Sequence, residues 1–231
     1  FRQFNALLGA NNLVPECWGL NASGQVGNGT VTFTNVSTPT FIALSVGAPA
    51  VYDSTSLALG WAHTCVLSAA KVAFCWGSNG FGQLGTGDAL SSVAQSIISA
   101  VVMPPGVFFS KIAAGEHHTC AVSTTGAAYC WGRNDYGQLG NPATPPGTNS
   151  AVPVLVGGGL IFRSISAGEL FTCGVAGSAP GIAPPALIPG TPSQLPGTVY
   201  CWGDNLFGEI GQGTTGNNAP ILTPTKVKYQ P

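Results

Sequence analysis

The sequence predicts an all-β fold, and more narrowly a β-propeller whose blades each contain about four short strands. A line of eleven residues that begins Cys-Trp-Gly occurs four times along the 231-residue chain. Between the copies lie short extended segments separated by Gly and Pro, and no segment has the period of an amphipathic helix. Repeats of this size with about four strands each are typical of propeller blades.

The repeated line reads Cys-Trp-Gly-x-Asn-x-x-Gly-[Gln/Glu]-[Val/Leu/Ile]-Gly, and its copies lie at 17–27, 75–85, 130–140 and 201–211. A second line that ends in Thr-Cys precedes three of the copies, at 59–65, 114–120 and 167–173. An extended run follows each copy. We expect one propeller region over 1–231, divided into a partial unit at 1–16, repeats at 17–74, 75–129 and 130–200, and a partial unit at 201–231.

The hairpin around Gly126 predicts a disulfide. In the segment CAVSTTGAAYC, Cys120 and Cys130 are placed symmetrically about a three-residue loop that ends in Gly126. A loop of this length with Gly in last place favours a hairpin in which that Gly takes a left-handed conformation. Cysteines directly opposite each other on antiparallel strands are close enough to form a disulfide.

Two further cysteine pairs share this relation: Cys65 with Cys75, and Cys173 with Cys201. The first of these hairpins has Lys71 in place of the loop Gly, and the second carries a Pro-rich insertion at 177–197, which we interpret as an elongated hairpin tip. Metal sites need CxxC-type clusters or grouped histidines, and the chain has neither, so three disulfides are favoured over metal ligands or reduced core thiols.

Cys17 begins the first copy of the line but has no partner of this kind. The residue ten positions earlier, where the hairpin symmetry would place the second cysteine, is Leu7. We therefore expect Cys17 to be unpaired or bonded to a group outside this chain.

The other recurring residues of the line are expected to build the scaffold. A Trp follows each cysteine on the opposite face of its strand, and a large ring at one place per blade is expected to pack as a wedge between neighbouring blades. The Gly residues supply turns that need positive φ or close backbone approach. The Asn fits the turn, since it can bond its own backbone two residues on. These positions are Trp18, Trp76, Trp131 and Trp202, and Asn79, Asn134 and Asn205.

Composition excludes several classes of function. Charged residues make up 6% of the chain, and seven Lys and Arg against eight Asp and Glu give a formal net charge of -1. No basic patch for nucleic acid can be assembled from so few cations. No stretch reaches the roughly 18 apolar residues of a membrane span, so we expect no membrane insertion by this segment. The low charge favours cover by glycans or packing into a larger assembly.

The two lines together resemble the RCC1-like repeat, the blade unit of the regulator of chromosome condensation propellers. That family carries an Ala-Gly-x-x-His-Thr line followed by a Trp-Gly-x-Asn-x-x-Gly-Gln-Leu-Gly line, and this chain matches both at 114–119 and 131–140. The resemblance covers essentially the whole chain outside 177–197 and implies a propeller, usually of about seven blades. Since this chain has about four, we expect it to be a processed chain or part of a larger propeller. As an alternative, the two partial units share one blade and close a ring.

The paired cysteines are similar to those in the secreted branch of the family, such as the repeats in crinkly-type plant receptor kinase ectodomains. This resemblance implies an extracellular or cell-surface location. Nuclear members of the family act as guanine nucleotide exchange factors and bind chromatin, and the cysteine pairs and a pI of about 6.3 argue against that role here.

Catalysis finds little support, because the few carboxylates and histidines fall in repeat columns. One column holds Trp61, Glu116 and Glu169, and another holds His63, His118 and Phe171. A column that accepts either His or Phe is expected to serve packing. His117 and His118 are adjacent, and neighbours on a strand point to opposite faces, which disfavours a metal pair. We expect no enzyme, no cofactor and no metal.

The function predicted is a non-catalytic, secreted or cell-surface module that is structural or recognises a protein, within a larger glycoprotein assembly. Surfaces for a protein partner or for self-assembly are expected where the repeat is abandoned, at 28–40, 141–152 and 177–197. Sequons for N-linked glycans lie at Asn28 and Asn35, and at Asn21, which also occupies the turn-Asn column.

Three alternatives stay open. A secreted inhibitor that caps an enzyme would need an aromatic-rich loop rim, and the loops are poor in aromatic residues. A guanine nucleotide exchange factor would need the nuclear context that the cysteines oppose. A glycan-binding or glycan-processing protein would need carboxylates and aromatic rings together near the propeller axis, which the sequence does not show.

Overall fold

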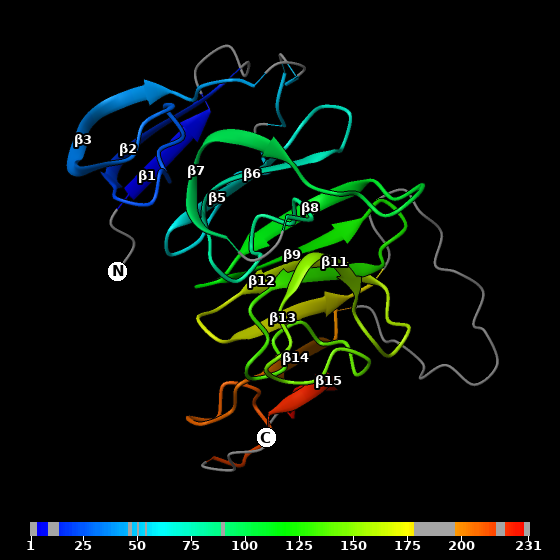
Figure 1. Ribbon diagram of the computed structural model, residues 1–231. Coiled ribbons are helices and arrows are strands. Elements are labelled where there is room, and N and C mark those ends of the chain that lie inside the picture. Colours follow the sequence, from blue (N-terminus) through cyan, green and yellow to red (C-terminus); the bar gives the residue numbers. More distant parts are fainter. Residues whose placement is uncertain are drawn as a thin grey trace.

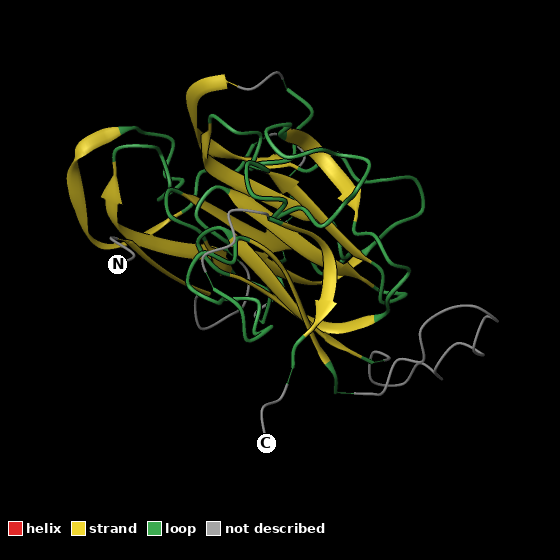
Figure 2. Cartoon of the chain, turned by 90° about the horizontal axis from the view of Figure 1, so that it is seen from below, coloured by secondary structure: helices red, strands yellow, loops and turns green. Residues whose placement is uncertain are grey.

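The computed structural model describes residues 4–8, 14–45, 48–49, 51–53, 55–88, 91–177, 197–215 and 220–228 (Figure 1). Figure 2 shows strands through the body of this described part, joined by loops. Within it, no helix has the length and apolar character needed to cross a membrane. The strands are β1 (Phe4–Leu8), β2 (Pro15–Asn21), β3 (Thr32–Phe41), β4 (Ala58–Leu59), β5 (His63–Leu67), β6 (Ala73–Asn79), β7 (Ser91–Ala100), β8 (Phe109–Ala114), β9 (His118–Ser123), β10 (Ala128–Gly132), β11 (Ser150–Leu155), β12 (Phe162–Ala167), β13 (Phe171–Ala176), β14 (Val199–Gly203) and β15 (Ile221–Lys226).

These strands form four antiparallel sheets, which are the blades. Blade 1 contains β1 to β3, blade 2 contains β4 to β7, blade 3 contains β8 to β11 and blade 4 contains β12 to β15. Figure 1 shows the sheets following one another in chain order, from blue to red. The first strands of successive blades pack together, with β8 against β4 and β5, and β12 against β8 and β9. The all-β fold with blade-like, mostly four-stranded sheets is therefore confirmed.

The blades and the sequence repeats have different boundaries. The Cys-Trp-Gly strand is the third strand of a four-stranded blade, so each sequence repeat joins the second half of one sheet to the first half of the next. The repeat at 75–129, for example, runs from β6 of blade 2 into β10 of blade 3. The end segments likewise pair within different sheets, β1 with β2 and β15 with β14. In the described structure β1 and β15 therefore lie in different blades.

The disulfide hairpins have the register that their symmetry indicates. Cys120 lies opposite Cys130 and Val122 opposite Ala128 across β9 and β10, with Gly126 in the loop at φ 90°. Lys71, which replaces the Gly in blade 2, also has a positive φ of 65°. The three disulfides join Cys65 to Cys75, Cys120 to Cys130 and Cys173 to Cys201.

The first hairpin differs from this pattern. Ala6, and not Leu7, lies opposite Cys17, because Leu8 pairs with Pro15 and the connection between β1 and β2 shifts the partner by one residue. The expectation for Leu7 was wrong for this reason. Cys17 is a free thiol in the structure and is fully buried, and burial raises its pKa to about 12. It is therefore a protonated core side chain, shielded from groups outside the chain.

The Pro-rich insertion falls largely outside the described residues, which omit 178–196. Its base is described, and the hairpin pairing reaches it. The Ala176 amide donates to the Thr198 carbonyl at 2.7 Å, and the Gly197 amide donates to the Ala176 carbonyl at 2.9 Å. The insertion therefore leaves from the end of the β13–β14 hairpin, as an elongated tip would.

Candidate functional site

Adjacent blades are joined by a Trp and a Thr that share one carbonyl. Trp131 Nε1 and Thr119 Oγ1 of blade 3 both donate to the Gln83 carbonyl of blade 2, at 2.9 and 2.8 Å. The same pair of bonds links blade 1 to blade 2 and blade 3 to blade 4, through Trp76 and Thr64 on Gln25 and through Trp202 and Thr172 on Gln138. We call this arrangement the joint. Each of these three Trp rings is completely buried, so they occupy the wedge positions that the repeat suggests.

The last Gly of the line is required by the joint. Gly85 has φ +70°, and a Cβ built on it would lie 2.7 Å from the indole Nε1 of Trp131. A side chain at this position would therefore be strained and would also displace the ring from its seat.

The Asn of the line holds the turn in a way that the sequence interpretation missed. Asn79 Oδ1 accepts a hydrogen bond from the Leu84 amide, five residues on, at 3.1 Å. The other copies do the same, with Asn21 bonded to Val26, Asn134 to Leu139 and Asn205 to Ile210, each at 3.1 Å. The expected bond two residues on was wrong, because the side chain spans the whole turn that presents the Gln or Glu carbonyl.

The His column serves packing between blades. His63 Nε2 bonds Thr119 Oγ1 at 3.0 Å, and His118 Nε2 bonds Thr172 Oγ1 at 2.9 Å, so each His reaches the next blade. Both rings are fully buried. Burial, reinforced by the neighbouring His117, lowers the pKa of His118 to about 3, so its imidazole is neutral. Phe171 occupies the same column in blade 4, the last described blade, where it is partly buried.

The first and last blades expose aromatic side chains whose counterparts lie between blades. Trp18 of blade 1 is partly exposed, whereas Trp76, Trp131 and Trp202 are completely buried. In blade 4, Phe207 is 81% exposed, whereas its counterpart Phe81 stacks on His117 of the next blade with 4.8 Å between ring centroids. Both outer faces therefore have the form of a blade contact.

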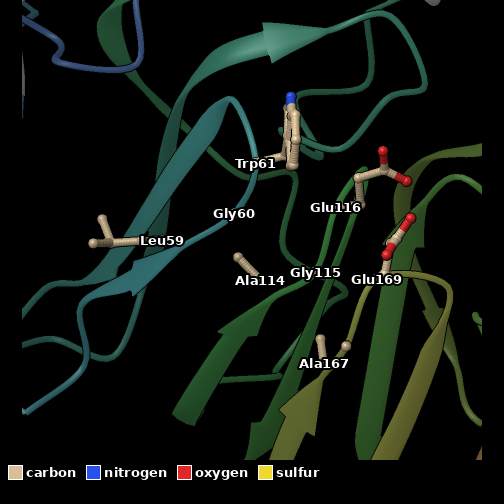
Figure 3. A pocket seen from close by; sticks show the side chains of 9 residues that line it. Leu59, Gly60, Trp61, Ala114, Gly115, Glu116, Ala167 and Glu169 are labelled. Carbon is tan, nitrogen blue, oxygen red and sulfur yellow. The ribbon is translucent and has the colours of Figure 1, made fainter. Parts of the chain in front are cut away.

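A pocket opens where three blades meet. The loops that follow β4, β8 and β12 surround a cavity of about 270 Å³, which we call the three-blade pocket. Its lining repeats in triplets, Leu59, Gly60 and Trp61, then Ala114, Gly115 and Glu116, then Ala167, Gly168 and Glu169. Figure 3 shows Trp61 on one side of the pocket and the Glu116 and Glu169 carboxylates together on the other.

The glycines of the pocket allow the blades to approach closely. A Cβ on Gly115 would lie 2.5 Å from the Gly168 carbonyl and would also strike the ring of His118. The Glu116 amide meets the Glu169 carbonyl at 3.4 Å. The glycines therefore contribute backbone to the pocket lining, and the residue after each Gly contributes the largest polar or aromatic side chain of its triplet.

Of the charged groups around the pocket, Glu116 lies close to two basic side chains. Glu116 lies 3.5 Å from Arg133 Nη1 and 3.5 Å from His117 Nε2. Arg133 also makes a shorter contact with Asp135, at 2.6 Å, and its guanidinium lies over the Phe81 ring. The pKa of His117 is lowered, mainly by burial, although Glu116 opposes the shift. His117 therefore adds no full positive charge near neutral pH.

The pocket contradicts one expectation from the sequence, that aromatic and carboxylate side chains do not meet at one site. An aromatic ring and carboxylates were not expected to meet near the propeller axis, yet Trp61, Glu116 and Glu169 line one cavity. The signal was present in the sequence as a repeat column that holds unlike residues. His117 and His118 do point apart, since His118 is buried and His117 stacks on Phe81.

The sequons differ in accessibility. Asn21 is fully buried, and its Nδ2 donates to the Thr30 carbonyl at 3.0 Å, so its side chain is part of the scaffold and its place among the glycan candidates was wrong. Asn28 is partly exposed, and its Oδ1 accepts from the Thr30 hydroxyl at 2.7 Å. Asn35 is exposed on β3.

The segments expected as partner loops also differ from one another. Most of 28–40 is the outer strand β3, where Phe33 is 90% exposed. The segment 141–152 is loop up to β11, and 178–196 lies outside the described residues.

Comparisons with known proteins agree with this architecture. A family model described as "Regulator of chromosome condensation (RCC1) repeat" matches residues 17–67, 72–122 and 125–175, and a second model of the same description matches 55–83 and 109–138. The human "Probable E3 ubiquitin-protein ligase HERC4" is 30% identical over 207 residues, which are 90% of this chain and 17% of that protein. The chain therefore spans only a small part of this relative.

Solved structures show the same fold. Human WBSCR16 superposes with a TM-score of 0.77 at 18% identity, covering 99% of this chain and 53% of that one. A weaker similarity, at 23% identity and a TM-score of 0.44, is to the ectodomain of the Physcomitrella patens receptor kinase CR4, covering 87% of this chain and 36% of that one. Since the RCC1 repeat model covers most of the described blades, the chain belongs to the regulator of chromosome condensation (RCC1) repeat family.

Proposed function

We propose that this chain is a non-catalytic recognition module of an extracellular or cell-surface protein, and that it binds a segment of a protein partner at the three-blade pocket. The observation that carries the proposal is the lining of that pocket. Three successive repeats place a half-exposed indole and two carboxylates around one cavity.

The extracellular part of the proposal is supported by the three disulfides. Disulfides persist in oxidising compartments and are rare in reducing ones. Because the chain has seven cysteines, the secreted protein should release one thiol per chain, that of Cys17, when it is denatured without reductant. Three or more thiols in protein purified from a secreting host would contradict this location.

The non-catalytic part of the proposal is supported by the commitments of the titratable groups. His118 is neutral and bonded to Thr172, His117 is stacked on Phe81, and Glu116 contacts Arg133. Beside the Glu116 and Glu169 carboxylates, the pocket lining contains no Ser, Cys, His or Lys, so no Ser-His or Cys-His nucleophilic pair is formed there.

Selection from a displayed random-peptide library tests the proposal. Peptides that bind the disulfide-intact chain would be counter-selected on the double variant Trp61→Ser/Glu169→Gln. We expect a class of peptides that binds the parent, fails on the variant, and is recovered with unchanged mass after long incubation. If no peptides depend on the pocket, or if bound peptides are cleaved or modified, the proposal fails.

A further inference from the structure

We infer that the three-blade pocket receives a cationic side chain, a lysine ammonium or an arginine guanidinium, presented by a protein partner. This inference rests on the proposed function and names the chemistry that the same site recognises. It is carried by the cavity, by the charge at its mouth and by the exposed indole.

The charge at the mouth is negative. Glu116 and Glu169 are two of only eight acidic residues in the chain, yet they line the same cavity. Arg133 lies near Glu116 but is shared with Asp135, which it contacts more closely. Within the described residues Glu169 forms no salt bridge. A cation entering the pocket would therefore meet a carboxylate without a competing partner.

The indole of Trp61 supplies the second contact. Trp61 is 52% exposed, whereas the Trp rings of the three joints are completely buried and their Nε1 atoms are bonded. Trp61 is thus held at the pocket without a place in a joint. An aromatic face beside carboxylates favours a cation over a neutral group, because the ring quadrupole attracts positive charge.

The size of the pocket limits its occupant. Its volume of about 270 Å³ lies just below the range of roughly 300 to 1,000 Å³ that holds drug-sized ligands. Gly115 and Gly168 approach closely beside the cavity, since a Cβ on Gly115 would lie 2.5 Å from the Gly168 carbonyl. One long side chain fits this space, and a strand or helix of the partner does not. A neutral sugar ring would also fit, but it would leave the charge of Glu169 uncompensated.

Titration of the ¹⁵N-labelled, disulfide-intact chain tests the inference directly. The probes are the N-acetyl methylamides of lysine and arginine, with that of norleucine as the uncharged match and N-acetylglucosamine as the neutral alternative. The readout is the indole N–H resonance of Trp61, assigned by its loss in Trp61→Phe. We expect saturable shifts with lysine or arginine, and none with norleucine or the sugar.

Variants sharpen the test. Glu169→Gln should weaken cation binding by about fivefold or more, since it removes the unpaired charge. Asp88→Asn removes one charge from an exposed turn of blade 2, away from the pocket lining, and should leave binding unchanged. A saturable shift with norleucine or the sugar, no shift with either cation, or equal binding by Glu169→Gln would each overturn the inference.

The peptide selection separates this failure from failure of the proposed function. Pocket-dependent peptides without Lys or Arg would leave the recognition module standing and overturn the cationic ligand. An absence of pocket-dependent peptides would instead overturn the recognition module.

Discussion

The joints and the three-blade pocket are built from the same repeats but follow opposite rules. At each joint the residues recur, as in Trp76, Trp131 and Trp202, because each indole must reach a carbonyl of the preceding blade. At the pocket the corresponding residues differ, as in Trp61, Glu116 and Glu169, because they face a cavity. A position that bonds across blades is fixed by its neighbour, whereas a position open to solvent can change with function.

The largest expected effect comes from breaking a joint. Trp131→Ala should lower the free energy of unfolding by about 3 to 5 kcal/mol, since it leaves a cavity and the Gln83 carbonyl loses a donor. Trp18→Ala should cost only about 1 to 2 kcal/mol, because Trp18 is partly exposed. Urea unfolding followed by fluorescence measures both. Equal losses would show that burial at the joint is not what stabilises the blades.

The second-largest expected loss of stability comes from removing a disulfide. In the chain-entropy description, Cys173→Ala/Cys201→Ala should cost about 3.5 kcal/mol and Cys120→Ala/Cys130→Ala about 2.7 kcal/mol, because the first pair closes the longer loop. The sequence separations are 28 and 10 residues. Denaturant midpoints of the two double variants give the order, and a reversed order would show that the insertion does not act as a free loop.

The His column predicts an acid-sensitive joint. His118 has a folded pKa of about 3, below the ordinary value of 6.5, so the unfolded chain binds the extra proton. Stability should therefore fall as the pH drops from about 6.5 toward 3, by up to about 1.4 kcal/mol per pH unit. His118→Phe, which copies Phe171, should flatten this dependence at a cost of about 1 kcal/mol at pH 7 for the lost bond to Thr172.

Unfolding midpoints between pH 4 and pH 8 measure this effect. His117→Phe is the comparison variant: burial also lowers the pKa of His117, so this change should flatten the dependence as well, but less than His118→Phe, because His117 is only partly buried. If His118→Phe keeps the full acid sensitivity of the parent, the buried imidazole is not its source.

The smallest stability effect is expected at the pocket. Trp61→Glu places in blade 2 the residue that blades 3 and 4 already carry at this position. Because Trp61 is half exposed and takes no part in a joint, unfolding free energy should stay within about 0.5 kcal/mol of the parent. A loss similar to that of Trp131→Ala would place Trp61 in the scaffold and erase the difference between the two regions.

The sequence predicts features that depend on local spacing. The hairpin symmetry of Cys120 and Cys130 and the left-handed Gly126 follow from a short loop, and the structure has both. The sequence could not predict that Ala6, and not Leu7, lies opposite Cys17. Leu8 pairs with Pro15, so this hairpin does not have the three-residue loop found around Gly126.

The repeat predicted that the Trp rings pack between blades, but not the hydrogen bonds that join them. The Asn79 side chain spans five residues because the turn must present the Gln83 carbonyl to Trp131, a partner 48 residues away. The three-blade pocket depends in the same way on three loops far apart in the sequence. Its residues were visible as a column, but only the packing of β4, β8 and β12 shows that the column faces one cavity.

The central claim is that the joints provide stability and the pocket provides recognition. The most direct test measures both properties in Trp61→Gln, which removes the indole without adding a charge, namely its urea midpoint and its binding of a pocket-dependent peptide. Our account predicts an unchanged midpoint and a loss of binding of at least about tenfold, because the indole face is gone. Retained binding with an unchanged midpoint would contradict it.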